Sequence, residues 1–428
     1  MRIRHLIAGN TLVQFIGKAV TAGTTFIVTI LIARSYGVTG FGEFTKITTY
    51  VSLFYLIADF GMNAVFLREE QSERAGEKSF SFVTLLSTRF IWTLIMGMLA
   101  LIIVVFLPAF EESNTGFTPL VKLGIIILLP TIVTQGVFVS CNALFQKNLR
   151  YDLSVIAAIL GSIAIVSFVT IATAIHVSLV FLLLSYVIGG IILMSAAWLL
   201  SSRYRTKLTL VFPRLFYEGK ALFVRSLPLG VTLLFNLIYF RADIFLLTLY
   251  RSTEEVGVYG LATKVFELPL TIPIFLMNAV YPILLKLTVK SEKMEAIKKT
   301  LIVLLGLSLV VTLAGFILAP FFILIKEEFI ASVVPFRVLL LSLPVFFISS
   351  LYMWVFIAEG KRWRLSAIYG SGMILNILLN LIFIPRFGIM AAAVITGVSE
   401  LYILILLVVT FRRFHFNASL PKIPQQHR

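Results

Sequence analysis

Twelve charged residues lie within long, otherwise apolar stretches, and their chemistry is the most informative feature of the sequence. The basic members are Lys18, Lys46, Arg89, Lys122, Arg225, Arg241, Lys264 and Arg337, and the acidic members are Asp59, Asp243, Glu267 and Glu400. A charged side chain at the centre of a bilayer costs roughly 2.5–3.5 kcal/mol, so it is expected to face water or an opposite charge. The basic excess favours a passage that binds an anion, whereas a carrier of cations would be expected to have an acidic excess.

These charges differ in predicted depth. Four basic residues lie near the ends of predicted spans, where a long side chain can reach the interface: Lys46, Lys122, Arg225 and Arg337. The deepest charges are Lys18, Arg89, Arg241 and Glu400. Lys264 and Glu267 are three residues apart on one helix face, so they can pair with each other. Arg241 and Asp243 are two residues apart and do not face each other, so each needs a partner from another element.

Other kinds of chemistry are not indicated by the sequence. It contains no Gly-x-x-x-x-Gly-Lys-Ser/Thr phosphate loop, so coupling to ATP would need another subunit. The four histidines lack metal-ligand spacing, and the single cysteine, Cys141, excludes an intrachain disulfide and a thiolate metal cluster. We therefore expect no metal site and no bound cofactor. A membrane enzyme that builds glycans is disfavoured, because the predicted outer loops are too short for a large external active site.

Membrane-spanning helices are the elements that must position these charges. Hydrophobic residues make up 59% of the 428 residues and charged residues only 13%, about half the charged share of a soluble domain. Roughly 20 apolar residues form a helix that crosses the hydrocarbon core, and runs of that length recur along the chain. We predict an all-α integral membrane protein with about twelve spans, at 11–33, 44–66, 80–107, 119–143, 153–174, 178–200, 223–249, 258–285, 300–325, 333–357, 365–384 and 388–411.

The loop charges predict the orientation of these spans. With the N-terminus in the cytoplasm, 24 Lys and Arg residues fall in the inner segments and four fall in the outer loops. Cytoplasmic loops carry the excess of Lys and Arg, so both termini are expected to be cytoplasmic in a multi-pass protein of the cytoplasmic membrane. This basic inner surface accounts for most of the net charge of +16, so binding of nucleic acid is not expected.

The two halves of the chain share a pattern at an offset of 215 residues. Phe41-Gly42-Glu43-Phe44 precedes Met62-Asn63-Ala64-Val65, and Val256-Gly257-Val258-Tyr259 precedes Met277-Asn278-Ala279-Val280. Six spans per half insert in the same direction, which predicts two six-helix lobes related by a parallel pseudo-two-fold repeat, with the substrate path between them. The expected organisation is an N-terminal lobe at 1–205, a cytoplasmic or interfacial linker at 206–222, a C-terminal lobe at 223–411 and a cytoplasmic tail at 412–428.

An ordered set of short motifs resembles a known family. The motifs are Gly40-Phe41-Gly42-Glu43-Phe44, Ala58-Asp59-Phe60-Gly61-Met62, Phe223-Val224-Arg225-Ser226-Leu227-Pro228-Leu229-Gly230, Arg241-Ala242-Asp243-Ile244-Phe245-Leu246-Leu247 and Val256-Gly257-Val258-Tyr259-Gly260-Leu261-Ala262. In this order they resemble the polysaccharide-biosynthesis flippases, which include O-antigen exporters, of the multidrug/oligosaccharidyl-lipid/polysaccharide superfamily. The resemblance covers nearly the whole chain.

The resemblance implies a transporter that works by alternating access. Its substrate would be an undecaprenyl-diphosphate-linked oligosaccharide, flipped across the cytoplasmic membrane while the prenyl tail stays in lipid. The implied substrate-binding residues are Lys18, Lys46, Arg89, Arg241 and Lys264, and the candidates for ion coupling or a structural role are Asp59, Asp243 and Glu400. The implied partners are the polyprenyl-diphosphate-linked glycan, membrane lipids and polysaccharide polymerase or assembly proteins.

The sequence also bears on the energy source for transport and on two alternative functions. A membrane potential that is negative inside assists the outward movement of an anion by about 2.3 kcal/mol per charge per 100 mV. Coupling to a gradient of H+ or Na+ is a further possibility. A multidrug exporter of the same superfamily is one alternative function, although the basic intramembrane residues argue against it. A lipid II flippase is the other, although twelve spans rather than fourteen argue against that.

Overall fold

The protein is described here from a computed structural model, which defines residues 2–73, 80–110, 114–205, 212–287 and 289–416. Most of these residues are helical, as expected where lipid offers no partner for open backbone groups. The helices of the first half are α1 (Arg2–Leu56), α2 (Met62–Glu73), α3 (Phe82–Phe106), α4 (Pro119–Leu128), α5 (Pro130–Lys147), α6 (Tyr151–Ala174) and α7 (Leu179–Leu200). Those of the second half are α8 (Phe212–Tyr250), α9 (Thr253–Glu267), α10 (Thr271–Lys286), α11 (Lys290–Leu318), α12 (Val333–Ala358) and α13 (Arg362–Phe416).

Short elements complete the described part of the chain. Three 3-10 turns lie at Ser201–Tyr204, Ala319–Leu324 and Glu327–Ser332. The strands β1 (Ala109–Phe110) and β2 (Thr115–Gly116) form a small antiparallel ladder. Residues 206–211 of the predicted linker and 417–428 of the predicted tail lie outside the described residues. From Phe212 onward, the linker is already part of α8, so it runs directly into the seventh predicted span.

The structure confirms a multi-pass, all-α membrane protein. Ten helical stretches among the described residues are long and apolar enough to cross a membrane. Two of them, Ile16–Leu56 and Trp363–Phe414, contain 41 and 52 residues, which is about two spans each. They bend at Gly37 (φ 68°) and Gly388 (φ 57°), where glycine adopts a positive φ at little cost. Divided at these bends, the ten stretches correspond to the twelve predicted spans.

The regular α-helix is interrupted within several predicted spans, and in span 119–143 the interruption is the single residue Leu129, between α4 and α5. In span 44–66, α1 ends at Leu56 and α2 begins at Met62, with Phe60 (φ 44°) and Gly61 (φ 74°) in left-handed conformations between them. In span 258–285, α9 ends at Glu267 and α10 begins at Thr271. Hydropathy alone did not reveal these breaks, because the residues on both sides are apolar. Non-helical backbone such as that at Phe60 and Gly61 is tolerated at membrane depth where it is buried in protein or lines a cavity, so the first break marks a place of functional interest. At the second break Leu268 and Leu270 keep right-handed helical dihedral angles.

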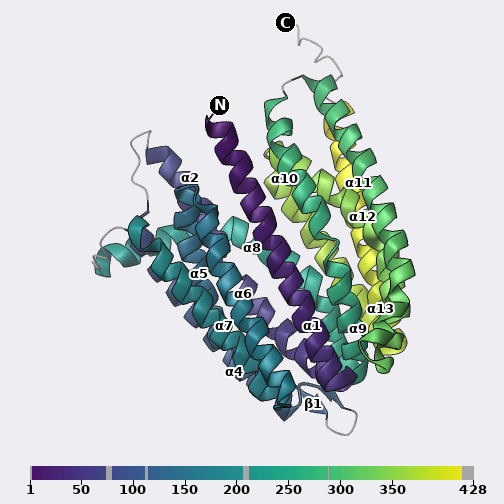
Figure 1. The fold of residues 1–428 in the computed structure, drawn as a ribbon. Coiled ribbons are helices and arrows are strands. Elements are labelled where there is room, and N and C mark those ends of the chain that lie inside the picture. The colour runs from purple at the N-terminus through teal and green to yellow at the C-terminus, as the bar shows by residue number, and fades with distance from the viewer. Residues whose placement is uncertain (1, 74–79, 111–113, 206–211, 288, 417–428) are drawn as a thin grey trace, which may run out of the picture.

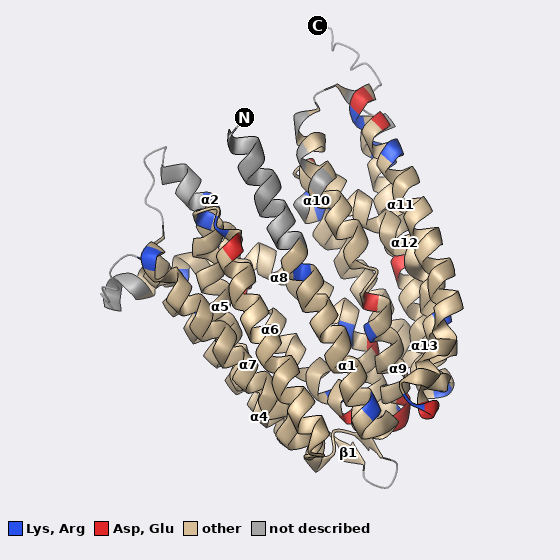
Figure 2. Cartoon of the chain, viewed as in Figure 1, with Lys and Arg blue, Asp and Glu red and all other residues tan. Residues whose placement is uncertain are grey.

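The helices form two groups that approach each other at one end (Figure 1). The group with α2 to α7 lies on one side and the group with α9 to α13 on the other, while α1 runs between them. The two groups converge near β1 and β2, which we call the hairpin end, and diverge toward the N- and C-termini. We call α1–α7 the N-terminal lobe and α8–α13 the C-terminal lobe. Charged residues are concentrated toward the ends of the helices, with a few along their middle (Figure 2).

Close contact between α1 and α9 joins the lobes at the hairpin end. A Cβ on Gly42 would lie 2.0 Å from the Thr253 carbonyl oxygen, and a Cβ on Gly257 would lie 2.2 Å from the Val38 carbonyl oxygen. Small residues allow helix backbones to approach closely in membranes. Gly42 and Gly257 are 215 residues apart, as are Val38 and Thr253, so the two contacts are reciprocal.

Candidate functional site

A cluster of three charged side chains joins α8 to α9 in the C-terminal lobe. Arg241 Nη1 lies 2.7 Å from Glu267 Oε1, and Lys264 Nζ lies 3.7 Å from Glu267 Oε2. The three side chains are partly exposed, between 14% and 29%. Arg241 Nε is buried and has no acceptor among the described residues. Two cations therefore share one carboxylate, and the cluster keeps a net positive charge and an unused donor.

This cluster confirms two predictions about side-chain pairing. Lys264 and Glu267 pair along one helix face, as their spacing indicated. Arg241 and Asp243 find separate partners, since Arg241 pairs with Glu267 while the Asp243 carboxylate accepts a hydrogen bond from Tyr259. Glu267 lies at the last residue of α9, beside the break before α10. The interrupted span 258–285 thus places Glu267 within the membrane region, together with its partners Arg241 and Lys264.

Lys18 lies on α1 and reaches toward the C-terminal lobe. Its Nζ lies 5.9 Å from the centroid of the Phe275 ring on α10, and the residue is exposed. A cation–π contact at an exposed site contributes about 0.5–1 kcal/mol. The contact holds Lys18 toward the opposite lobe while leaving its charge available to an anion.

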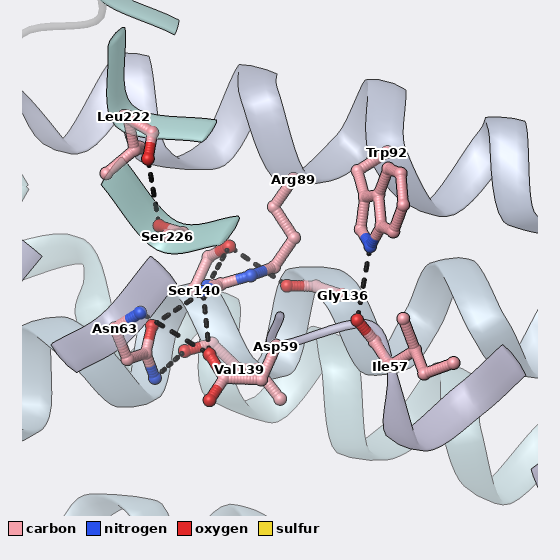
Figure 3. Close-up of polar contacts among 10 residues, drawn as sticks. All are labelled: Ile57, Asp59, Asn63, Arg89, Trp92, Gly136, Val139, Ser140, Leu222 and Ser226. Carbon is pink, nitrogen blue, oxygen red and sulfur yellow. Dashed lines mark hydrogen bonds and ion pairs between the residues drawn. The ribbon is translucent and has the colours of Figure 1, made fainter. Parts of the chain in front are cut away.

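Arg89 is instead enclosed within the N-terminal lobe (Figure 3). Its guanidinium donates to Asp59 Oδ1 at 3.0 Å, to Asn63 Oδ1 at 2.8 Å and to Ser140 Oγ at 3.0 Å. The Arg89 side chain is 0% exposed, whereas that of Asp59 is 36% exposed. Arg89 therefore ties α3 to α5 and to the break between α1 and α2. In this conformation Asp59, rather than Arg89, is the member of the pair that water reaches.

Lys46 is buried at the hairpin end. Its Nζ donates to the Gly116 carbonyl oxygen at 3.0 Å and to Thr253 Oγ1 at 2.7 Å. It is 1% exposed. Lys46 therefore links α1 to the β1–β2 segment and to the start of α9. The structure brings Arg241 and Lys264 together and leaves Lys18, Lys46 and Arg89 in three separate environments.

The remaining acidic candidates lie in two buried polar sites of the C-terminal lobe. Asp243 Oδ2 accepts from the Tyr259 hydroxyl at 2.6 Å, and Glu400 Oε2 accepts from the Tyr239 hydroxyl at 2.8 Å. Ser349 also donates to Glu400. Asp243 is 6% exposed and Glu400 is 2% exposed, and neither forms an ion pair with a described residue. Two buried carboxyl groups held only by hydroxyl and backbone donors are suited to binding a proton or a small cation.

Amide side chains form a further buried polar group in this lobe, which charge patterning did not reveal. Asn376 Nδ2 donates to Ser399 Oγ at 3.2 Å, and Asn380 Nδ2 donates to Asn376 Oδ1 at 2.9 Å. Asn380 Oδ1 is buried without a donor among the described residues. Asn376 and Asn380 are neutral, so the pattern of charged residues does not include them. Their spacing of four on one helix, in a stretch without charge, is the signal that could have identified them. No cluster of three or more His, Cys, Asp or Glu residues suited to a metal ion occurs in the described ranges.

Comparisons with known proteins agree with this architecture. A family model described as "Polysaccharide biosynthesis protein" matches residues 7–288. No curated protein matches the chain at a significant level.

Solved transporter structures share the fold over nearly their full length. A structure of the lipid II flippase MurJ in an inward closed conformation superposes with a TM-score of 0.74, at 14% identity, over 94% of this chain and 87% of that one. An inward-facing multidrug resistance MATE family transporter of the MOP superfamily gives 0.72, at 14% identity, over 92% and 94%. A mutant of the Vibrio cholerae MATE transporter VcmN gives 0.67, at 12% identity, over 96% of both chains. At these identities the similarity concerns the fold.

Proposed function

Because the chain belongs to the polysaccharide biosynthesis protein family, we propose that it is a flippase for an undecaprenyl-diphosphate-linked oligosaccharide. It carries this substrate across the cytoplasmic membrane by alternating access between the two lobes, without acting as an enzyme. The observation that carries the proposal is the Arg241–Lys264–Glu267 cluster, in which two cations share a single carboxylate at membrane depth.

The diphosphate is the part of the substrate that these cations bind. Arg241 offers guanidinium donors in a geometry that suits phosphate oxygens, and its buried Nε is still without an acceptor. Lys264 adds a second positive charge at the same carboxylate. Lys18 supplies a third cation from α1, facing α10 of the other lobe. An anion that passes between Lys18 and the Arg241–Lys264 pair would contact both lobes in turn, which ties its movement to that of the lobes.

An apolar groove beside the cluster suits the prenyl tail. It has a volume of about 600 Å³ and is lined by Phe26 and Ile30 of α1, by Val265 and Leu268 next to Lys264, and by residues of α11 and α12. Both lobes contribute to its walls. A lipid whose diphosphate lies at Lys264 can leave its hydrocarbon chain in this groove, so that only the polar head crosses the interior.

Neutralising the cluster should abolish transport while leaving the protein folded. In Arg241→Gln/Lys264→Gln, two charge-assisted contacts of about 1.5–3 kcal/mol each are lost, so affinity for the substrate should fall by about a hundredfold or more. The measurement is flipping of a fluorescent undecaprenyl-diphosphate oligosaccharide in proteoliposomes, with binding to the detergent-purified protein in parallel. Lys299→Gln is the matched control, because that lysine is exposed and pairs only with Glu295. Wild-type flipping by the double variant would refute the site.

The same assay separates the proposed substrate from the alternatives. Flipping of lipid II in place of the oligosaccharide lipid would identify a lipid II flippase. Export of cationic dyes without flipping would identify a multidrug exporter. We further propose that polysaccharide polymerase or assembly proteins receive the flipped product, since a flipped repeat unit still has to be joined to a chain.

The buried carboxyl groups of the C-terminal lobe are our candidates for coupling to a gradient of H+ or Na+. Asp243 and Glu400 are each held by a tyrosine hydroxyl and lack an ion-pair partner among the described residues. A proton or Na+ bound at Asp243 would neutralise the negative charge of that carboxylate. Arg241, a member of the substrate cluster, lies two residues away on the same helix. Binding of a cation at Asp243 would therefore change the field at the substrate cluster. Asp59 stays a candidate in the N-terminal lobe, where its exposed oxygen faces water beside Arg89.

Asp243→Asn and Glu400→Gln should uncouple transport from the ion gradient. Each amide keeps an oxygen that accepts the tyrosine hydrogen bond, so the fold should persist, but neither can take up or release a proton. We expect flipping in proteoliposomes to lose its acceleration by an imposed pH or Na+ gradient, while the detergent-purified protein still binds the substrate. Asp152→Asn, at the exposed start of α6, is the control. Full gradient dependence in both variants would exclude these residues from coupling.

A further inference from the structure

The N-terminal lobe contains a second cavity whose chemistry differs from that of the cationic cluster. It has a volume of about 400 Å³, within the range of small-molecule sites, and lies between α1, α4, α5, α6 and α7. Its lining includes Thr48, Ser52, Thr134, Gln135 and Tyr186 and contains no charged side chain. Most lining residues are only partly buried, so the cavity is accessible from the protein surface. Apolar surface makes up most of the rest of the lining, so the ligand that fits is uncharged and combines apolar faces with hydrogen-bonding groups.

The lining presents hydrogen-bond acceptors more than donors. The hydroxyl protons of Thr48, Ser52 and Thr134 are donated to the carbonyl oxygens of Phe44, Thr49 and Thr131, at 2.8, 2.7 and 3.0 Å. Each hydroxyl oxygen keeps lone pairs that can accept. Gln135 Oε1 is buried and has no donor among the described residues. A buried acceptor without a partner costs about 1–3 kcal/mol, so a ligand that donates an O–H to Gln135 is favoured over a hydrocarbon chain of the same shape.

The cavity begins one helical turn along α1 from Lys18, one of the proposed phosphate-binding residues, whose ammonium group extends toward Phe275 of α10. Thr21, which also lines it, donates to the carbonyl oxygen of Lys18 at 3.0 Å, one helical turn away. In the proposed substrate the sugar next to the diphosphate is separated from it by a single glycosidic bond. A diphosphate at Lys18 would therefore present that sugar to Thr21 and to the cavity beyond.

We infer that this cavity is a subsite for neutral sugar residues of the lipid-linked oligosaccharide, next to the diphosphate. The inference rests on the proposed function and assigns separate tasks to the two lobes. The cations retain any polyprenyl diphosphate, while the hydroxyl- and amide-lined cavity responds to the presence of a sugar. The flat ring of Tyr186 gives the apolar face of a sugar ring a surface to pack against, in addition to the hydrogen bonds.

Binding of matched lipids to the full-length protein in detergent tests this inference. The probes are undecaprenyl diphosphate alone and the same lipid carrying one glucose, galactose or N-acetylglucosamine. We expect at least one sugar to raise the affinity by about tenfold, the gain expected from one or two added hydrogen bonds. The double variant Thr48→Val/Gln135→Leu should lose that gain and bind every lipid as the wild type binds the bare one. Thr170→Val, an exposed position further along α6, should bind like the wild type.

The outcomes separate this inference from the proposed function. Equal affinity of the wild type for bare and sugar-bearing lipids would overturn the subsite while leaving the diphosphate site intact. A sugar-dependent gain that survives in the double variant would also overturn it. If none of the lipids binds, the proposed function itself fails. Lys18→Gln should weaken the bare and the sugar-bearing lipids by the same factor, because it removes a contact to the diphosphate.

Discussion

Gly42→Ala should keep the two lobes from meeting at the hairpin end and should abolish transport. The new Cβ would lie 2.0 Å from the Thr253 carbonyl oxygen, which is backbone and cannot rotate away. Relief requires α1 and α9 to separate, so the conformation described here becomes less favourable. Each 1.4 kcal/mol of that cost changes the ratio of conformations tenfold. A transporter that cannot populate one of its alternating states cannot complete a cycle.

Labelling of a buried cysteine reports this change directly. Val256 is 0% exposed at the contact, so a Val256→Cys reporter in a Cys141→Ser background should react slowly with a maleimide. Adding Gly42→Ala should raise the labelling rate on the order of tenfold. Gly23→Ala is a control in the same helix, because nothing lies within 4 Å of its Cβ position. Slow labelling and normal flipping by Gly42→Ala would show that this contact does not govern the cycle.

The reciprocal position tests the predicted repeat. Gly257→Ala would place a Cβ 2.2 Å from the Val38 carbonyl oxygen. Gly257 is the residue 215 positions after Gly42. Thr39 Oγ1 and Glu254 Oε1, which are 215 residues apart, lie 3.4 Å from each other. If α1 and α9 cross on a pseudo-two-fold axis, then the two alanine variants should raise the labelling rate by similar factors. Strongly unequal factors would argue against the axis.

Asp59→Leu should destabilise the protein by about 1–3 kcal/mol, because the enclosed Arg89 loses its carboxylate; this is less than the roughly 3–5 kcal/mol of a fully buried pair, since water reaches and screens Asp59. Arg89 would remain fully enclosed with only Asn63 and Ser140 as acceptors, and its Nε already has no acceptor among the described residues. The measurement is the apparent melting temperature of the purified protein in detergent. Asp59→Asn keeps an oxygen acceptor and should cost less.

A double variant distinguishes loss of the pair from loss of packing. In Asp59→Leu/Arg89→Met both charges are replaced by apolar groups, which is often far less damaging than removing one partner. The double variant should therefore melt above Asp59→Leu. Glu295→Gln breaks an exposed pair with Lys299 and should leave the melting temperature unchanged, because exposed pairs contribute little. A wild-type melting temperature for Asp59→Leu would contradict this prediction, because it would mean that water or other acceptors stabilise the Arg89 guanidinium without Asp59.

The sequence by itself determined the membrane class, the number of spans and the local pairings. Apolar runs, loop charges and the spacing of Lys264 and Glu267 are properties of neighbouring residues, so they can be read along the chain. Even the bends at Gly37 and Gly388 fall where the sequence separates successive spans. The family resemblance came from the order of short motifs and agrees with the family match.

Only the tertiary structure decided which charges are enclosed and which are available. Arg89 and Arg241 look alike in sequence, yet one is fully buried against Asp59, Asn63 and Ser140, and the other shares a partly exposed carboxylate with Lys264. Lys46 is held by a carbonyl and a hydroxyl from segments 70 and 207 residues away. The energy of a charge in a membrane depends on partners that are distant in the chain, and hydropathy does not contain that information.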